Sequence, residues 1–263
     1  MKAVQIFSGI IFFVLVSGSL LISCSKEKGK SRLSVYLTDA PAGYDAVYID
    51  VARVEIKVSS DQSDNGWQEL PVNAGIYNLL EFTNGMDTLL SSIELPAGKV
   101  SQLRLILGSD NSIVLNGATI PLPLQTPSAQ TSGLKFNIHA NLVEGVEYKL
   151  WIDFDCARSV VVTGNYDYKL KPVIRTFTEA TSGAIMGNVQ PAAAQATVYA
   201  ISGLDSLSAI PDAVTGNYLI RGVPAGSWKV AADGNNGYVD QSIDNVAVSL
   251  GNVTVVDTIT LVP

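Results

Sequence analysis

The fold is decided by residues 33–58, LSVYLTDAPAGYDAVYIDVARVEIKV, which hold two strand-like patterns joined by a turn. In the first part, apolar Leu33, Val35 and Leu37 alternate with Ser, Tyr and Thr, as side chains do on a half-buried strand. The stretch DAPAG at residues 39–43 then ends the pattern with turn-forming residues. The sequence therefore predicts a β-strand, a turn and a second strand.

The second strand of this stretch changes phase in its middle. Apolar residues stand at positions 47, 49 and 51 and then at 54, 56 and 58, so the alternation breaks at Ala52-Arg53. One extra residue in a strand produces this break, and we predict a β-bulge there. A gap between two separate strands would give the same pattern.

The alternation recurs along the rest of the chain. Gly, Pro, Asn and Asp separate the apolar runs, and Asn116-Gly117 is typical of a two-residue hairpin turn. Only residues 76–92 could hold a helical turn. We expect strands at residues 100–107, 112–115, 134–140, 146–155 and 170–177, followed by 184–189, 196–201, 218–222, 227–232, 243–250 and 253–261. The fold class is therefore all-β, with sandwiches whose apolar faces cover each other.

Composition divides these strands into two groups. The small-residue stretch EATSG at residues 179–183 separates them. We expect two tandem β-sandwich domains, residues 33–179 and 180–263, each of ordinary domain size.

The first 23 residues differ from all that follows. Lys2 precedes an apolar stretch, residues 4–21, that ends in small residues, as secretory signal peptides do. An uncleaved transmembrane helix is the alternative, since about 20 apolar residues span a bilayer. Ser and Gly interrupt the stretch, however, so we predict a signal peptide over residues 1–23.

Residues 21–24 read LISC. This tetrapeptide resembles the lipobox of bacterial lipoproteins, and the resemblance implies cleavage before Cys24 and lipid on that cysteine. Residues 24–32 would then form the lipidated cysteine and a short polar tether. Ser25 is not the aspartate associated with inner-membrane retention, so we expect a lipid-anchored envelope protein, preferentially in the outer membrane.

Charge is distributed unevenly along the mature chain. The tether carries a formal charge of +3, whereas residues 33–263 hold 12 Lys and Arg against 23 Asp and Glu, which gives −11. A basic tether beside anionic headgroups is favourable, and an acidic body argues against nucleic-acid partners. We expect a membrane contact through the lipid and a glycan or envelope protein as partner.

Two sets of motifs resemble known families. The first set is LSVYLTDAPAGYD at 33–45, the run 47–58, LPAGK at 95–99, QLRL at 102–105 and SGLK at 132–135. It resembles domain of unknown function 4382, over about residues 32–177, a family common in bacterial lipoproteins. This resemblance implies location and fold and leaves the activity open.

The second set of motifs lies beyond residue 180: GNY at 216–218, GVPAGSWKV at 222–230, VAV at 246–248, Gly251 and the run closing at Leu261. It resembles the carboxypeptidase regulatory-like domain, a transthyretin-like sandwich. The resemblance implies that Tyr218 and Trp228 fill the space between sheets, and the domain's relatives have a carbohydrate-binding-like fold.

One loop resembles the start of a calcium site. In DQSDNG, residues 61–66, oxygen donors stand at Asp61, Ser63 and Asn65 with a glycine at the sixth position. The twelfth position is Val72, where such a loop needs glutamate. A tight Asn65-Gly66 hairpin explains the same residues, and we favour it over a metal site.

Asp153 and Asp155 could suggest the carboxylate pair of a glycosidase. Their spacing instead makes them neighbours on the outer face of one strand, where they cannot flank a substrate bond. We expect this face to be solvated. Should a ligand bind here, Trp151 on the same face is the ring on which a sugar would stack.

Asp39 is expected to close the turn before Pro41 by bonding its own backbone two residues on, rather than to bind a ligand. Asp39, Asp45 and Asp50 could still meet at one end of the sandwich. His139 is the only histidine, which excludes a multi-histidine zinc site, and we expect it on an outward face. Cys156 has no disulfide partner in the mature chain, and we expect it to pack quietly.

These observations favour a non-enzymatic lipoprotein that binds or presents a ligand, with carbohydrate as the first choice and no cofactor. The alternative is a structural or adhesive subunit of a fimbria-like assembly, in which cleavage after Arg32 frees a strand for donation. A hydrolase is the third and least favoured hypothesis, because the sequence contains no nucleophile turn such as GxSxG.

Overall fold

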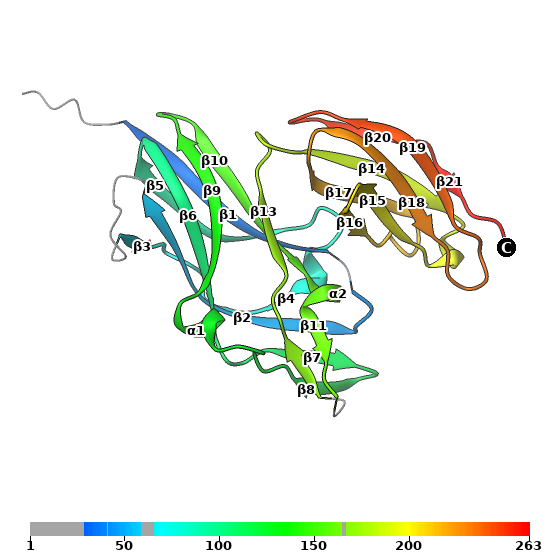
Figure 1. Cartoon of the computed structure of the whole chain (residues 1–263), viewed down its shortest axis with the longest axis horizontal. Helices are drawn as coiled ribbons and strands as arrows, with labels where there is room; N and C mark the ends of the chain where they lie inside the picture. The colour runs from blue at the N-terminus through cyan, green and yellow to red at the C-terminus, as the bar shows by residue number, and fades with distance from the viewer. Residues whose placement is uncertain (1–28, 41, 59–65, 165–166) are drawn as a thin grey trace, which may run out of the picture.

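The computed structural model describes residues 29–40, 42–58, 66–164 and 167–263. The described chain is almost entirely β-structure, which confirms the predicted fold class, and its strands form two units along the sequence (Figure 1). The predicted signal peptide, Cys24 and the candidate calcium ligands Asp61, Ser63 and Asn65 lie outside the described residues. Within the described part, no helix is long and apolar enough to cross a bilayer.

Over its described residues, the first domain has thirteen strands and three one-turn helices. They are β1 (Lys30–Ala40), β2 (Ala46–Val58), β3 (Trp67–Glu69), β4 (Gly75–Asn78), η1 (Leu79–Phe82), β5 (Thr88–Pro96), β6 (Gly98–Leu107), β7 (Ser112–Leu115), β8 (Ala118–Pro121), α1 (Ser128–Thr131), β9 (Leu134–Leu142), β10 (Glu147–Asp155), α2 (Cys156–Ser159), β11 (Val160–Val162), β12 (Tyr168–Leu170) and β13 (Ile174–Phe177).

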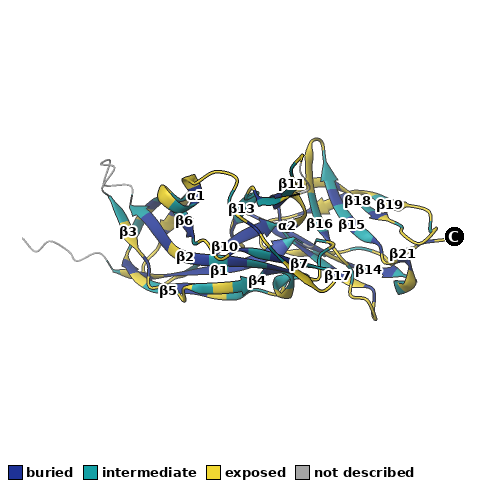
Figure 2. Cartoon of the chain, turned by 90° about the horizontal axis from the view of Figure 1, so that it is seen from below, coloured by how far each residue is buried: buried dark blue, intermediate teal, exposed yellow. Residues whose placement is uncertain are grey.

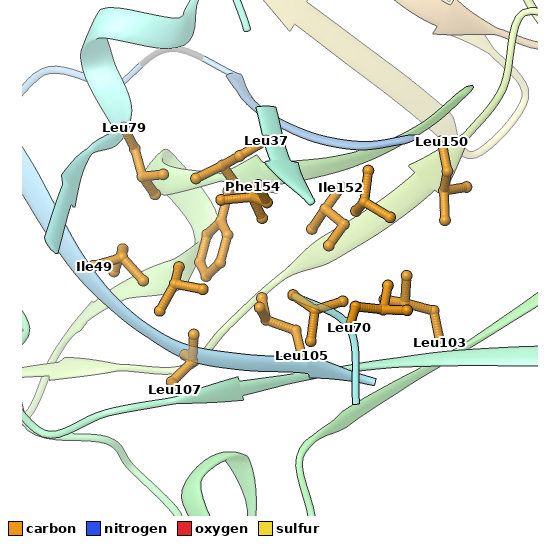
Figure 3. Close-up of a cluster of buried hydrophobic side chains, with 14 of the residues drawn as sticks. Leu37, Ile49, Leu70, Leu79, Leu103, Leu105, Leu107, Leu150, Ile152 and Phe154 are labelled. Atoms are coloured by element: carbon orange, nitrogen blue, oxygen red, sulfur yellow. The ribbon is translucent and has the colours of Figure 1, made fainter. Parts of the chain in front are cut away.

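Two sheets of this domain enclose its core. One has the order β13-β10-β1-β5, with β1 parallel to β10, and the other has the order β8-β7-β2-β6-β9, with β3 and β4 also paired to β2. Figure 3 shows side chains from the two sheets meeting, with Leu37, Ile152 and Phe154 on one side and Leu105 and Leu107 on the other. Period-two alternation makes this possible because it places one apolar face on each strand.

The predicted bulge in β2 is confirmed. The strand runs without interruption from Ala46 to Val58, and its register with β6 shifts between Val51 and Arg53. Val51 and Val54, on either side of the shift, are both fully buried. The extra residue therefore lets both apolar halves of one strand face the same core.

Other local predictions were confirmed in part. Asn116 and Gly117 both have positive φ, 51° and 75°, as a type I′ hairpin requires. The helical turn expected within residues 76–92 is η1, and the ends of that range belong to β4 and β5. The expectation that only this range holds a helical turn is wrong, because α1 and α2 are also one-turn helices. The predicted strand 170–177 is wrong as one element, because Pro172 has no N–H for a ladder and separates β12 from β13.

The second domain is a smaller sandwich of two sheets. Its elements are β14 (Gly183–Gln190), η2 (Ala192–Ala194), β15 (Thr197–Ser202), β16 (Asp205–Ala209), β17 (Asn217–Val223), β18 (Gly226–Asp233), β19 (Gln241–Val248), β20 (Val253–Val255) and β21 (Ile259–Thr260). One sheet has the order β17-β14-β20, with β21 also paired to β14, and the other has the order β16-β15-β18-β19. Tyr218 and Trp228 lie in a core separate from that of the first domain.

Candidate functional site

The outer face of the β13-β10-β1-β5 sheet carries the predicted ligand residues. Trp151 and Asp153 point outward from β10, as the alternation predicts, yet each is only 5% exposed. The prediction of a solvated face is therefore wrong. Period two identifies which residues share a face, whereas the cover of Trp151 comes from Phe177 and from Arg221 of the second domain. Much of β10 is accordingly coloured as buried in Figure 2.

Three aromatic rings stack on this face. Trp151 lies 5.4 Å from the ring of Tyr36 and 5.5 Å from the ring of Phe177, with interplanar angles of 19° and 5°. Its indole N–H donates to the Asp87 carboxylate at 2.8 Å, which supplies the partner that a buried Trp needs. Both faces of the indole are thus covered, so Trp151 offers no surface for a sugar to stack on.

Two arginines fasten the domains to each other beside this stack. Arg175 pairs with the Asp153 carboxylate at 2.5 Å and donates to the carbonyls of Gly222 and Arg221, at 2.8 and 2.9 Å. Arg221 of the second domain pairs with Asp87 of the first at 2.8 Å. We call Trp151, Phe177 and these two ion pairs the joint.

The joint shifts the protonation of Asp153. Burial raises the pKa of its carboxyl above the ordinary value, and the Arg175 guanidinium, which favours the charged form, limits that rise. The nearest cation to this buried carboxylate therefore also holds the two domains together.

Asp39 does not close the predicted turn. It lies near the end of β1, 6% exposed, and its Oδ1 accepts a hydrogen bond from the backbone N–H of Cys156 at 3.2 Å. The prediction of a bond two residues on is wrong, because Pro41 has no N–H to donate. Among the described residues, Asp39 Oδ2 has no hydrogen-bond partner.

Burial raises the pKa of the Asp39 carboxyl well above its ordinary value, and the hydrogen bond from Cys156 only partly offsets this. The folded chain therefore holds the Asp39 proton more tightly than the unfolded chain. Stability from this group is present at low pH and is lost as the pH rises through the raised pKa.

The variant Asp39→Asn removes this pH dependence while keeping the shape of the side chain. We expect the variant to match the wild type near pH 4 and to become more stable than it at pH 7, by about 1 kcal/mol, because no carboxylate has to ionise in the core. Urea unfolding between pH 4 and pH 8 measures this, with the exposed Asp244→Asn as control. A constant difference at every pH would contradict it.

Cys156 and His139 lie as predicted. Cys156 is fully buried, and burial together with the Asp39 carboxyl raises the pKa of its thiol well above the usual range, so the thiol stays protonated and unreactive. His139 is exposed on β9 with φ of 44°.

Asp45 and Asp50 do not join Asp39. Asp45 accepts from the N–H of Gly117, and Asp50 accepts from the N–H of Asp110. Across the residues that the structure covers, no group of three or more His, Cys, Asp or Glu side chains is placed to hold a metal ion.

A cleft of about 420 Å³ lies beside the joint, between the two domains. This volume falls in the range typical of small-molecule sites. The cleft is lined from the first domain by Ala40, Asp153, Asp155, Arg158 and residues 173–177, and from the second by residues 204–208, Gly222, Pro224 and Trp228. Of the predicted ligand residues, Asp153 and Asp155 reach it, whereas Trp151 and Asp39 do not line it.

Local structure explains how Asp155 and Arg158 are held at the cleft. Asp155 is the N-cap of α2, and its carboxylate accepts the backbone N–H of Arg158 at 3.0 Å. The two side chains also form an ion pair at 3.7 Å, in which Arg158 is 69% exposed. The sequence gives no local signal that Arg158 lies in a cleft, because the opposite wall comes from the second domain.

Comparison with known proteins identifies one family model, described as "Domain of unknown function (DUF4382)", which matches residues 30–172. This agrees with the resemblance seen in the first set of motifs. No curated protein matches the chain.

Among solved structures, the chain is similar to the Bacillus anthracis TIE protein, with 12% identity and a TM-score of 0.23 over 89% of this chain and 35% of that one. It thus spans about a third of that protein. A C-terminal fragment of the pilus adhesin SpaC from Lactobacillus rhamnosus GG has 10% identity and a TM-score of 0.21, over 88% and 97% of the two chains. The minor pilin GBS52 of Streptococcus agalactiae has 12% and 0.20, over 88% and 96%. TM-scores this low carry no conclusion about function.

Proposed function

Since the chain belongs to the domain of unknown function 4382 family, whose description assigns no activity, we propose that it is a non-enzymatic envelope protein that binds a ligand in the cleft between its two domains. The cleft carries the proposal, because its volume and its mixture of charged, hydroxyl and apolar groups suit a specific ligand.

The joint supports a binding role by fixing the walls of the cleft. Arg175 lines the cleft and also bonds to Asp153 on one wall and to Gly222 on the other. A site whose walls are already fixed loses less conformational entropy on binding than one that closes around its ligand.

Carbohydrate is the ligand class that the sequence favours. Because the ring of Trp151 is covered, we propose that the sugar binds in the cleft instead of on that ring. Asp155, Arg158 and the Ser206 and Ser208 hydroxyls offer polar partners for sugar hydroxyls. The cleft would be presented at the membrane by lipid on Cys24, with the basic tether next to the headgroups and the outer membrane as the preferred location.

Binding to a glycan array tests this function, with the full chain in detergent. Arg158→Ala is the matched variant, because its side chain is exposed and lies outside the joint. We expect wild-type binding to a defined set of glycans and about tenfold or greater weakening in the variant, as for the loss of a charged hydrogen bond. Lys229→Ala, whose ion pair to Asp244 is exposed, should bind normally. A blank array with folded protein would remove carbohydrate as the ligand.

The alternative, a structural or adhesive subunit, is favoured by the position of β1. This N-terminal strand lies between β10 and β5, and Leu33, Val35 and Leu37 are fully buried. The strand that cleavage after Arg32 would free is β1, which starts at Lys30 and is paired on both sides in the intact chain. Loss of β1 would open a groove that a strand of a second copy could fill. Detergent-resistant ladders of oligomers on a gel, formed by the full chain, would support this alternative.

A further inference from the structure

Two strand edges face the interdomain cleft. β13 is the outermost strand of the β13-β10-β1-β5 sheet, and β16 is the outermost strand of the β16-β15-β18-β19 sheet. They lie on the two sides of the junction between the domains (Figure 1). Within the part of the chain that the structure covers, β13 pairs only with β10 and β16 only with β15.

The residues that line the cleft show that the cleft lies beside the edges of β13 and β16, and not over the face of a sheet. Successive side chains of a strand point to opposite faces, so a cavity over the face of a sheet is lined by alternate residues. Here residues 173–177 and 204–208 line the cleft without a gap. Uninterrupted runs place the cavity beside each strand, where its backbone groups point.

Ladder geometry identifies the backbone groups that face outward. In an antiparallel pair, every second residue bonds to its neighbour, and the residues between direct N–H and C=O away. The bond from Asp155 N–H to the Val173 carbonyl therefore leaves Ile174 and Thr176 facing out of β13. The two-residue turn that pairs Ser202 with Asp205 leaves Ser206 and Ser208 facing out of β16.

These edges carry only part of the usual protection against strand addition. Natural proteins protect strand edges with Lys, Pro, bulges, other charged side chains or very short strands, and β13 and β16 are short, with one charged residue each. Neither β13 nor β16 contains Lys or Pro, and the two outward residues of β16 are small serines. The ligand that best matches regular rows of backbone donors and acceptors is another extended backbone.

The charges of the cleft select among such ligands. Its lining holds three carboxylates, Asp153, Asp155 and Asp205, against two guanidiniums. Arg175 is paired with Asp153 and Arg158 with Asp155, which leaves the Asp205 carboxylate as the excess charge of the lining. The body of the chain adds −11 over residues 33–263. A cationic ligand is therefore favoured over an anionic one.

We infer that the cleft binds a cationic extended peptide, which adds as a strand to the outward edge of β16 while its other edge faces β13. This inference rests on the proposed binding role of the cleft, and it gives a peptide in place of a carbohydrate as the ligand class. Main-chain hydrogen bonds to Ser206 and Ser208 supply the recognition, and the Asp205 carboxylate in the lining favours Lys or Arg in the peptide.

A synthetic octapeptide of alternating Thr and Val with Lys at each end is the probe, titrated into the full chain in detergent by fluorescence anisotropy. Ser206→Pro removes an outward N–H that β15 does not use, whereas Ser206→Ala removes only the hydroxyl. We expect about tenfold weaker binding in the Pro variant and a change within about twofold in the Ala variant, because one backbone hydrogen bond is lost only in the first.

The same peptide with alternate backbone nitrogens methylated gives a second measurement that does not depend on folding of the Pro variant. We expect it to bind at least about tenfold more weakly than the parent peptide. Equal binding of both peptides, equal binding by both Ser206 variants, or no binding of the parent peptide would overturn the inference. Glycan binding without peptide binding would overturn this inference alone, whereas peptide binding with a blank array would support it and remove only carbohydrate.

Discussion

Replacing Arg175 by alanine is expected to lower the free energy of unfolding by about 3 kcal/mol, since removing one partner of a buried ion pair leaves the other charge uncompensated. Asp153 keeps its place in β10, where its side chain is 6% exposed, without the guanidinium at 2.5 Å. The lower end of the usual range applies, because Arg175 itself is 34% exposed. The carbonyls of Arg221 and Gly222 lose their donor as well, so the domains should also move more freely. Urea unfolding measures the first effect, and small-angle scattering measures the second.

Two matched variants isolate the cause of this loss. Lys229→Ala breaks an exposed pair at 3.9 Å and should change stability by less than about 1 kcal/mol. Arg175→Ala made in an Asp153→Asn background should cost clearly less than in the wild type, because no charge is stranded. An undiminished cost in that background would show that Arg175 acts through packing and the carbonyl bonds, not through Asp153.

Replacing Trp151 by alanine should cost about 3–5 kcal/mol, the usual range for a large buried aromatic. The substitution removes the ring between Tyr36 and Phe177 and leaves the Asp87 carboxylate without the indole N–H. Trp151→Phe keeps a ring in the stack and should retain part of the stability. Thermal and urea unfolding of the three proteins give the comparison.

Trp67 supplies the control for the aromatic stack. It is half-buried on β3, with the Arg104 guanidinium 4.4 Å above its ring, and Trp67→Ala should cost about 1 kcal/mol or less from that contact. If Trp151→Ala proves no more costly than Trp67→Ala, the stack does not hold the joint together.

Much of the fold could be predicted from the sequence, because apolar and polar residues alternate along a strand that buries one face. The bulge at Ala52 was visible for the same reason, since a phase change is a local signal. β5 was not predicted, because its residues TLLSSIELP do not alternate regularly. β16 also escaped, since its serines carry little hydrophobic pattern.

Only part of the candidate site could be predicted from the sequence. Asp153 and Asp155 were placed on the correct face, but nothing within β10 indicates that Arg175 and the second domain cover Asp153. That contact joins residues far apart in sequence or in different domains, so no local periodicity reports it. Asp39 was misplaced for another reason, because the turn chemistry assigned to it needs a donor that Pro41 lacks.

The place of β1 in its sheet has a mechanical consequence. The N-terminal end of the described chain and its C-terminus lie at opposite ends of the molecule (Figure 1). If the chain is anchored through Cys24 and holds a ligand in the cleft, as proposed, a pull between the two would draw β1 along its own length, against β10 on one side and β5 on the other. The hydrogen bonds of both ladders would then be strained together instead of opening one at a time. Such shear loading favours a slow rate of forced unfolding, the quantity that sets how long an anchored protein holds its load.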